Sequence, residues 1–153
     1  FTMCNCLMSF VEIEADVETG KMKLLRVVNA TDIGQIIDPL GLEGQLNACW
    51  GSAGIDSAIF EETIFDRRTG HTVNANLIDY KWRTFAELPD VQNVVLETPF
   101  PSHRFHAVGI AEIATAPGPS AVLMAASNAI GRWLYQYPVT PDRVLKALSK
   151  GVA

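Results

Sequence analysis

The chain has 153 residues and a formal net charge of −5; 48% of its residues are apolar and 19% are charged. This length fits one ordinary domain and leaves no room for two full ones. The apolar content excludes an intrinsically disordered chain, and an acidic balance without a Lys/Arg cluster argues against a nucleic-acid or anionic-membrane binder.

The first thirty residues predict a β-hairpin. Leu7–Val17 alternates in part between apolar and acidic residues, as a half-buried strand does. Asp16–Gly20 has turn chemistry, and Gly20 can adopt the positive φ that such a turn requires. Lys21–Asn29 (KMKLLRVVN) is then the second strand of the hairpin.

A loop and a helix rich in small residues follow. The loop Asp32–Pro39 ends in Asp-Pro, and a residue before proline is kept in extended geometry. Leu42–Phe60 spaces its large apolar side chains three to five residues apart and predicts one helix. Its glycines would cost an exposed helix about 1 kcal/mol each, so we expect close contact with another element or a ligand.

The middle of the chain predicts further strands. Glu62–Phe65 and Thr72–Leu77 flank the turn Asp66–Gly70, which is a strand–turn–strand pattern. Val91–Glu97 (VQNVVLE) is another strand, and it leads into a loop with prolines and histidines, Thr98–His106.

Two helices are expected near the C-terminal end. Ser120–Leu134 is apolar nearly all the way round, and a helix of that kind is usually buried on most sides. Thr140, Pro141 and Asp142 supply an N-cap hydroxyl, a first-turn proline and an early acid, so they predict a short helix over Asp142–Ser149.

The interleaved strands and helices predict an α+β fold of β-hairpins with packed helices, in one domain or part-domain over residues 1–153. No apolar stretch approaches the ~18–20 residues of a membrane span, and no basic-then-apolar leader opens the sequence. Because the sequence starts with Phe1, we expect a trimmed chain or a piece of a longer one. The low charged fraction suggests burial against a partner.

Cysteine usage favours a reducing, cytoplasmic location. The sequence has three cysteines, and an odd number does not make a disulfide framework. Cys4 and Cys6 form a C-x-C pair that could hold a metal in a free-standing binding domain. Without a second Cys or His cluster nearby, buried or loop thiols are the favoured interpretation.

Two places could carry chemistry. One is the Gly-rich helix start around Gly44 and Gln45, and the other is Glu112, which sits between a glycine-bearing turn and a Pro-Gly-Pro loop. The apolar neighbours of Glu112 predict a poorly solvated carboxylate, which is suited to general-base catalysis. Residue types alone nevertheless favour a structural role for this carboxylate, as an N-cap or a salt-bridge partner.

Several short motifs follow one another along the whole chain. The first part of the pattern is Asp32-Ile-Gly-Gln-Ile-Ile-Asp-Pro39, then Glu43-Gly-Gln45 and Glu61-Glu62. It continues with Asp79-Tyr80, Leu88-Pro89, Glu97-Thr-Pro99, Pro101-Ser102, Gly109-x-x-Glu112, Ser127-Asn-Ala-Ile130 and Pro138–Leu145. The order of these motifs resembles the large subunit of the molybdenum hydroxylases of the xanthine dehydrogenase/aldehyde oxidase family. The resemblance covers essentially the whole chain, which looks like the C-terminal part of that much longer subunit.

The resemblance implies a function and a set of site residues. It implies a molybdenum ion held by a pterin cofactor, in some enzymes as a cytosine dinucleotide, with no protein side chain as metal ligand. Gly44 and Gln45 match the family's Gly-Gln beside the cofactor, and Gly109 and Ala111 belong to the Gly-x-Gly-Glu that ends in Glu112. That glutamate is the base that takes a proton as oxygen derived from water attacks an electron-poor carbon of an N-heterocycle or aldehyde.

The resemblance also implies an assembly. Electrons would leave through the pterin to [2Fe-2S] clusters on an iron–sulfur partner chain, and in some complexes to FAD on a flavin subunit. Other molybdenum-domain chains would complete the cofactor cage, so the chain would be an enzyme only within a multi-subunit complex.

This sequence departs from the family pattern at three places. Ala111 stands where the family has Gly, Asp38 stands where Asn is usual, and Trp50 lies where paired glycines are favoured. Trp50 is expected to be a core residue. The extra methyl of Ala111 supports a rival interpretation, a structural subunit that kept the fold but lost the chemistry.

Two loop histidines and an arginine could also contact a substrate. His103 and His106 flank Arg104 in the loop before Glu112, and Arg104 could pair with a substrate carboxylate. Surface or hydrogen-bonded loop histidines are the commoner outcome, for these two as for His71.

Overall fold

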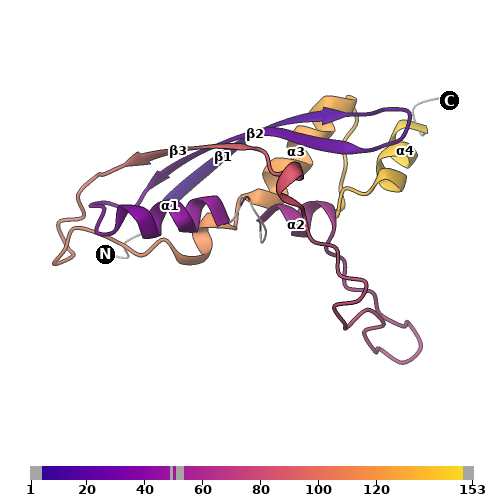
Figure 1. The fold of residues 1–153 in the computed structure, drawn as a ribbon, viewed down its shortest axis with the longest axis horizontal. Helices are drawn as coiled ribbons and strands as arrows, with labels where there is room; N and C mark the ends of the chain where they lie inside the picture. The colour runs from indigo at the N-terminus through magenta and orange to yellow at the C-terminus, as the bar shows by residue number, and fades with distance from the viewer. Residues whose placement is uncertain (1–4, 49, 51–53, 150–153) are drawn as a thin grey trace.

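The computed structural model describes residues 5–48, 50 and 54–149, and it confirms the expected α+β class (Figure 1). In chain order the elements are β1 (Cys6–Ala15), β2 (Met22–Asp32), α1 (Pro39–Ala48), α2 (Gly54–Ile59), η2 (Phe85–Glu87), β3 (Asp90–Leu96), η3 (Ala111–Ala114), α3 (Gly118–Ile130) and α4 (Pro141–Ser149). The two elements labelled η are short 3₁₀ helices. Over the described ranges, every helix is too short or too polar to cross a membrane.

The predicted hairpin is confirmed. β1 pairs with β2 in antiparallel register, with an irregularity between Glu12 and Ile13. In the connecting turn the Asp16 carboxylate accepts hydrogen bonds from the backbone N–H groups of Glu18 and Thr19. Gly20 has a φ of 75°, and a Cβ there would lie 2.3 Å from the carbonyl oxygen of Pro141, so only glycine fits.

The strand predicted at Val91–Glu97 is confirmed as β3, one residue earlier at each end. It pairs in parallel with β2, so the sheet order is β1-β2-β3. Strand patterns do not specify this parallel pairing. It requires the chain between β2 and β3 to return to the end of the sheet where β2 begins.

The single helix predicted over Leu42–Phe60 is wrong, because the structure has two helices there. α1 begins earlier than expected, since the Asp38 carboxylate accepts a hydrogen bond from the Gly41 N–H at 3.1 Å and caps it. An Asn side chain could accept the same hydrogen bond. The presence of Asp38 where Asn is usual therefore leaves the helix cap intact. α1 ends at Ala48 and α2 starts at Gly54; Cys49 and residues 51–53 lie outside the described residues.

The close packing expected of the small residues is present between α2 and α3. A Cβ on Gly118 would lie 2.8 Å from the carbonyl oxygen of Gly54. The two backbones therefore approach each other directly, as only glycine permits. Trp50 is 1% exposed and belongs to the core, as expected.

The helices gather on one face of the sheet. The main core cluster joins side chains of β2 to α1, α2 and α3, with residues of β1 and β3 packed against it. Its buried members are Leu24, Val27, Ile33, Leu42, Leu46, Trp50, Ile55, Ala58, Ala114 and Val122. A smaller cluster of Ala126, Leu134, Val139 and Val144 joins α3 to α4.

The two C-terminal helices differ in how well the sequence predicts them. α4 is confirmed, one residue earlier than expected, with Val144 fully buried. α3 ends at Ile130 because Gly131 takes a φ of 63° and closes it as a left-handed cap. It is not buried on most sides within the described chain, since Met124 is 58% exposed.

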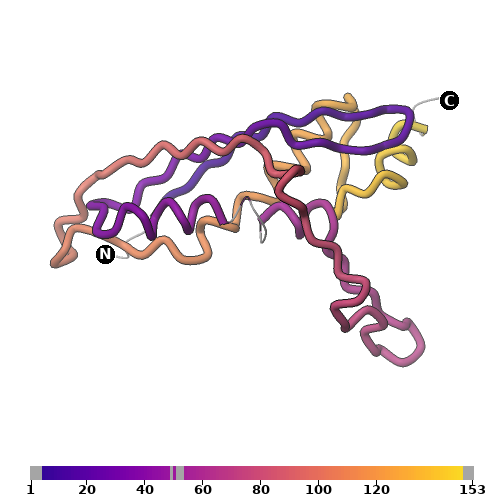
Figure 2. The backbone as a smooth tube through the Cα atoms, viewed as in Figure 1, coloured from indigo at the N-terminus to yellow at the C-terminus, as the bar shows by residue number. Residues whose placement is uncertain are grey.

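Residues 61–82 form an arm that projects from the body (Figure 2). The strand–turn–strand prediction is met only by a turn and a single bridge between Phe65 and Thr72. At its base the Arg83 Nη2 donates to the Asp56 carboxylate at 3.0 Å in a buried ion pair. The hydrogen bond that the Tyr80 hydroxyl donates to Glu61 raises the pKa of Tyr80 to about 12.

Candidate functional site

The Asp-x-Gly motif after β2 holds two loops together. Asp32 Oδ1 accepts hydrogen bonds from the N–H groups of Gly34 at 3.1 Å and Thr98 at 3.2 Å. Hydrogen bonding from Thr98 is the largest cause that holds the pKa of Asp32 below its usual value. The carboxylate therefore joins the end of β2 to the chain that follows β3.

Gly34 allows the second of these loops to lie directly against the first. Its φ is 71°, and a Cβ there would lie 2.2 Å from the carbonyl oxygen of His106. The Gln35 N–H donates to that same oxygen at 2.9 Å, and the Val108 N–H donates to the Ile33 carbonyl at 2.9 Å. The segment that leads toward Glu112 is thus fixed along the Asp-x-Gly motif.

Glu97 adds a further tie, because its Oε2 accepts a hydrogen bond from the Ile36 N–H at 3.1 Å. The motif residues Asp32, Gly34 and Glu97 accordingly have structural work in this chain. Their contacts hold the loop after β2 to the chain that follows β3.

Gly44 and Gln45 lie on the solvent-facing side of α1. Leu42 and Leu46 face the core on the same helix, and both are buried. Apart from its two chain neighbours and the backbone of α1 itself, no described atom lies within 4 Å of the position that a Cβ on Gly44 would take. Gln45 is exposed beside this gap. The backbone of α1 at Gly44 is therefore not covered by another element of the described chain.

Glu112 lies on the short helix η3 and is exposed. The poor solvation expected from its apolar neighbours is therefore not met within the described chain. Those neighbours turn inward, since Val108 and Ile110 pack on the main core cluster. Glu112 itself is exposed, so any desolvation must come from a group outside these residues.

The backbone beside Glu112 is strained. Ala111 has a φ of 31°, in the left-handed region that an L-residue with a Cβ adopts at a cost of about 1–2 kcal/mol. Gly109 has open space around its Cα, and its carbonyl oxygen accepts a hydrogen bond from the Asn5 side chain at 2.6 Å. The fold thus demands a glycine-like conformation where this sequence has alanine.

The two sequence-predicted places come together in the fold. α1 and η3 contact each other, and η3 also contacts β1 (Figure 1). The helix that carries Gly44 and Gln45 therefore lies against the short helix that carries Glu112, although the two are far apart in the sequence. Ala111 is the first residue of that short helix, and Gly109 lies two residues before it.

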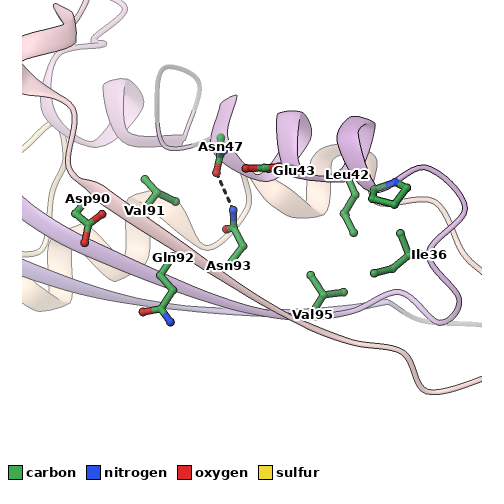
Figure 3. A pocket seen from close by; sticks show the side chains of 10 residues that line it. Ile36, Leu42, Glu43, Asn47, Asp90, Val91, Gln92, Asn93 and Val95 are labelled. Carbon is green, nitrogen blue, oxygen red and sulfur yellow. Dashed lines mark hydrogen bonds between the residues drawn. The ribbon is translucent and has the colours of Figure 1, made fainter.

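A groove of about 550 Å³ runs between α1 and β3 (Figure 3). Its lining includes Leu42, Glu43, Val91 and Val95. Asn47 of α1 lies across it from Asn93 of β3, and the Asn93 amide donates to the Asn47 side-chain oxygen at 2.7 Å.

That bond is the end of a chain of side-chain hydrogen bonds across the sheet. Ser9 Oγ donates to Asn29 Oδ1 at 2.8 Å, and Asn29 Nδ2 donates to Asn93 Oδ1 at 2.9 Å. The chain joins all three strands to α1, two residues from Gln45. The sequence analysis missed it, although asparagines inside two apolar strands are a visible signal because Asn is unfavourable there.

The loop histidines have partners within their own loop. His106 Nδ1 lies 3.1 Å from the Phe100 carbonyl oxygen, and the Phe105 N–H donates to His103 Nδ1. Arg104 lies over the Phe105 ring, 5.7 Å from its centroid. These contacts agree with hydrogen-bonded loop histidines.

The rival C-x-C metal site involves Cys4, which lies outside the described residues, and Cys6, which is exposed. Elsewhere in residues 5–48, 50 and 54–149, no group of three or more His, Cys, Asp or Glu side chains is placed to hold a metal ion.

Comparison with known proteins shows what this chain is similar to. The molybdopterin cofactor-binding domain family matches residues 1–89. The xanthine dehydrogenase molybdenum-binding subunit of Escherichia coli O157:H7 is 33% identical over 136 residues, which are 89% of this chain and 18% of that protein. The nicotine 6-hydroxylase large subunit of Paenarthrobacter nicotinovorans is 32% identical over 143 residues, 92% of this chain and 17% of that protein.

Solved structures agree with the sequence matches. A Cu,Mo-CO dehydrogenase superposes with a TM-score of 0.85 and 26% identity, over 95% of this chain and 18% of that one. Quinoline 2-oxidoreductase from Pseudomonas putida 86 superposes with a TM-score of 0.81 and 28% identity, over 90% of this chain and 18% of that one. The chain therefore spans about a fifth of the length of the proteins it matches.

Proposed function

The chain belongs to the molybdopterin cofactor-binding domain family, in the xanthine dehydrogenase/aldehyde oxidase group of molybdenum hydroxylases, and on that premise we propose that it forms part of a catalytic large subunit. The proposed reaction is the oxidative hydroxylation of an electron-poor carbon, in an N-heterocycle or an aldehyde, with oxygen from water. The chain would correspond to the C-terminal part of that subunit.

The surface around α1 and η3 fits one side of a pterin-cofactor site. The gap at Gly44 lets a ligand reach the helix backbone, and the Gln45 amide can both donate and accept hydrogen bonds without adding charge. Glu112 presents a free carboxylate at the same edge. These residues therefore fit a surface that contacts the pterin cofactor through hydrogen bonds. The metal would be held by the cofactor and not by side chains.

When bound, the molybdenum–pterin cofactor would supply two-electron redox capacity and the acidification of a water-derived oxygen. The chain's own residues would do the rest. Gly44 and Gln45 orient the cofactor from α1, while Gly109 and Ala111 shape the turn that aims Glu112. The carboxylate of Glu112 takes up the proton released during attack on the substrate carbon.

The remaining parts would come from elsewhere in the assembly. We assign the [2Fe-2S] clusters, and FAD where the complex contains it, to partner chains, together with the rest of the cofactor cage. A cytosine dinucleotide form of the pterin and a cytoplasmic location complete the proposal. Names of relatives that act on xanthine, nicotine or aldehydes support the substrate class.

The observation that carries the proposal is the contact between α1 and η3, because it gathers Gly44, Gln45 and Glu112 from distant parts of the sequence. The strained Ala111 supports one alternative, a structural subunit that kept the fold but not the chemistry.

The proposal can be tested through Gln45 in the complete complex. We expect Gln45→Ala to lower the molybdenum and pterin content per subunit, because the cofactor loses a hydrogen-bond partner on α1. Gln35→Ala is the matched control, since Gln35 is exposed and contributes its backbone N–H to the loop contact. Metal analysis measures the molybdenum content of each variant, and pterin fluorescence measures its pterin content. Equal content in both variants and the wild type would remove Gln45 from the site.

A further inference from the structure

The sheet has two faces of unexpected character. The face covered by the helices carries the polar chain of Ser9, Asn29 and Asn93, with Thr31 beside it. One row across the covered side is thus polar, where an antiparallel or mixed sheet with one solvated face would have apolar residues.

The opposite face, here called the open face, is mostly apolar between the row of Phe10 and the row of Leu96. The register places Phe10, Val28 and Gln92 in one row across the strands, and Met8, Ala30 and Val94 in the next. Leu96 follows in the third row, opposite Asp32. Because directly paired residues point to the same side of a sheet, these apolar side chains form one contiguous patch.

Burial confirms that no described element covers this patch. Phe10 is 62% exposed, Met8 59%, Leu96 55% and Val94 42%. None of them is a member of either core cluster, whereas the alternate residues Leu7, Val11, Val91 and Val95 all pack against the main one. The strands therefore carry apolar residues on both faces, as the strands of a sheet buried on both sides do.

Charges mark where the patch stops. In the row beyond Phe10, Glu12 lies opposite Arg26, which lies opposite Asp90. Arg26 is held there, since its Nη2 donates to the Gln92 side chain at 2.6 Å and its Nε lies 3.9 Å from Asp90. An apolar centre with a charged border on one side is the anatomy of a contact surface.

From this arrangement we infer that the open face is an interface within the large subunit, covered by an apolar layer from the polypeptide outside residues 1–153. The same fold occurs in Cu,Mo-CO dehydrogenase as 18% of a longer chain and in quinoline 2-oxidoreductase likewise, so such a polypeptide is available to cover it. The inference rests on the proposed function, because it takes the chain as part of that larger subunit.

The identity of the covering layer can be tested by crosslinking in the full-length subunit within its complex. The photoreactive residue p-benzoylphenylalanine is placed at Phe10, which has no assigned role in cofactor binding or catalysis. We expect crosslinks, mapped by mass spectrometry, to the same polypeptide outside the 153-residue segment. Crosslinks to the same segment of a second copy, to an iron–sulfur or flavin chain, or to nothing would each overturn the inference.

Thiol labelling gives an independent measure of burial. In the native complex we expect the Met8→Cys variant to react with a small maleimide at least 100-fold more slowly than after denaturation. Glu12→Cys, on the same strand and face but in the charged row, is the matched control and should react faster. Reaction of the Met8→Cys variant within about tenfold of the denatured rate would overturn the inference.

These outcomes are separable from the proposed function. A variant with full molybdenum content and activity but a reactive cysteine at position 8 would contradict the covered face alone. A protected cysteine and an intrachain crosslink in a subunit that binds no molybdenum would contradict the proposed function alone.

Discussion

At the scale of single residues, the most informative position is Ala111. The sequence shows only that alanine stands where related enzymes have glycine, and the structure adds that its φ is 31°. The fold therefore keeps a glycine-like backbone at this point and strains the alanine to do so. Strain of this kind is retained where the surrounding structure fixes the chain, and it often occurs beside functional groups.

Ala111→Gly should relieve this strain. We expect the variant subunit to be more stable by about 1 kcal/mol, because glycine adopts positive φ at little cost. Thermal unfolding of the wild type and the variant measures the difference. A matched substitution at Ala116, which has no recorded positive φ, should destabilise the protein slightly, since glycine there only adds freedom to the unfolded chain. Equal destabilisation at both positions would contradict the strain.

At the scale of elements, two helix glycines have opposite roles. Gly118 starts α3 and faces Gly54 so closely that a methyl group would clash with its backbone. Gly44 lies inside α1 with open space around its Cα. A helix-propensity argument alone would treat them alike.

Alanine at these two positions should therefore act in opposite directions. Gly118→Ala should destabilise the subunit by about 1–3 kcal/mol, because the methyl group overpacks the contact of α2 with α3. Gly44→Ala should stabilise α1 by up to about 1 kcal/mol while it lowers molybdenum content, since the methyl group occupies the space proposed for the cofactor. Unfolding curves and metal analysis give both readouts. A Gly44→Ala variant with full molybdenum content would contradict the proposed role of the gap.

Elements were predictable from sequence where local chemistry decides them. The hairpin, β3 and α4 follow from alternation, turn residues and the Thr140-Pro141 helix start. The split between α1 and α2 was not predictable from sequence, because the spacing of apolar residues continues through it. The parallel pairing of β3 with β2 was also missed, since pairing depends on contacts between distant residues.

At the scale of the whole molecule, the five site residues were predictable only through the resemblance to a family. Their residue types alone favoured a structural role for Glu112, and its apolar sequence neighbours suggested a desolvation that the described chain does not provide. The reason is geometric: Val108 and Ile110 pack on the core, while Glu112 is exposed. Under the proposed function, the site residues would form one wall of a cavity, and the rest of the subunit would supply the others.

The open sheet face and the exposed Glu112 lead to the same view of the molecule. The apolar side chains of the open face pack best when they are buried, and the Glu112 carboxylate functions best when it is buried. Both lie at the surface of the described chain. The chain spans about a fifth of the length of the proteins it matches, and the covering layer that we infer would lie outside it.

The most direct test of this account is the exchange Glu112→Gln in the complete complex. Glutamine keeps the size of the side chain but cannot accept the proton, and general-base catalysis is typically worth about 10²–10⁴-fold in rate. We expect the rate of enzyme reduction by substrate to fall by at least 100-fold with molybdenum content unchanged.

Glu97 would be a poor control, because it bonds to the Ile36 N–H; Glu18, in the exposed hairpin turn, is the suitable one. Glu18→Gln should leave the rate of enzyme reduction unchanged. Stopped-flow reduction of the fully loaded enzyme measures all three proteins. If Glu112→Gln retained more than about a tenth of the wild-type rate, Glu112 would not be the base, and the structural-subunit alternative would be favoured.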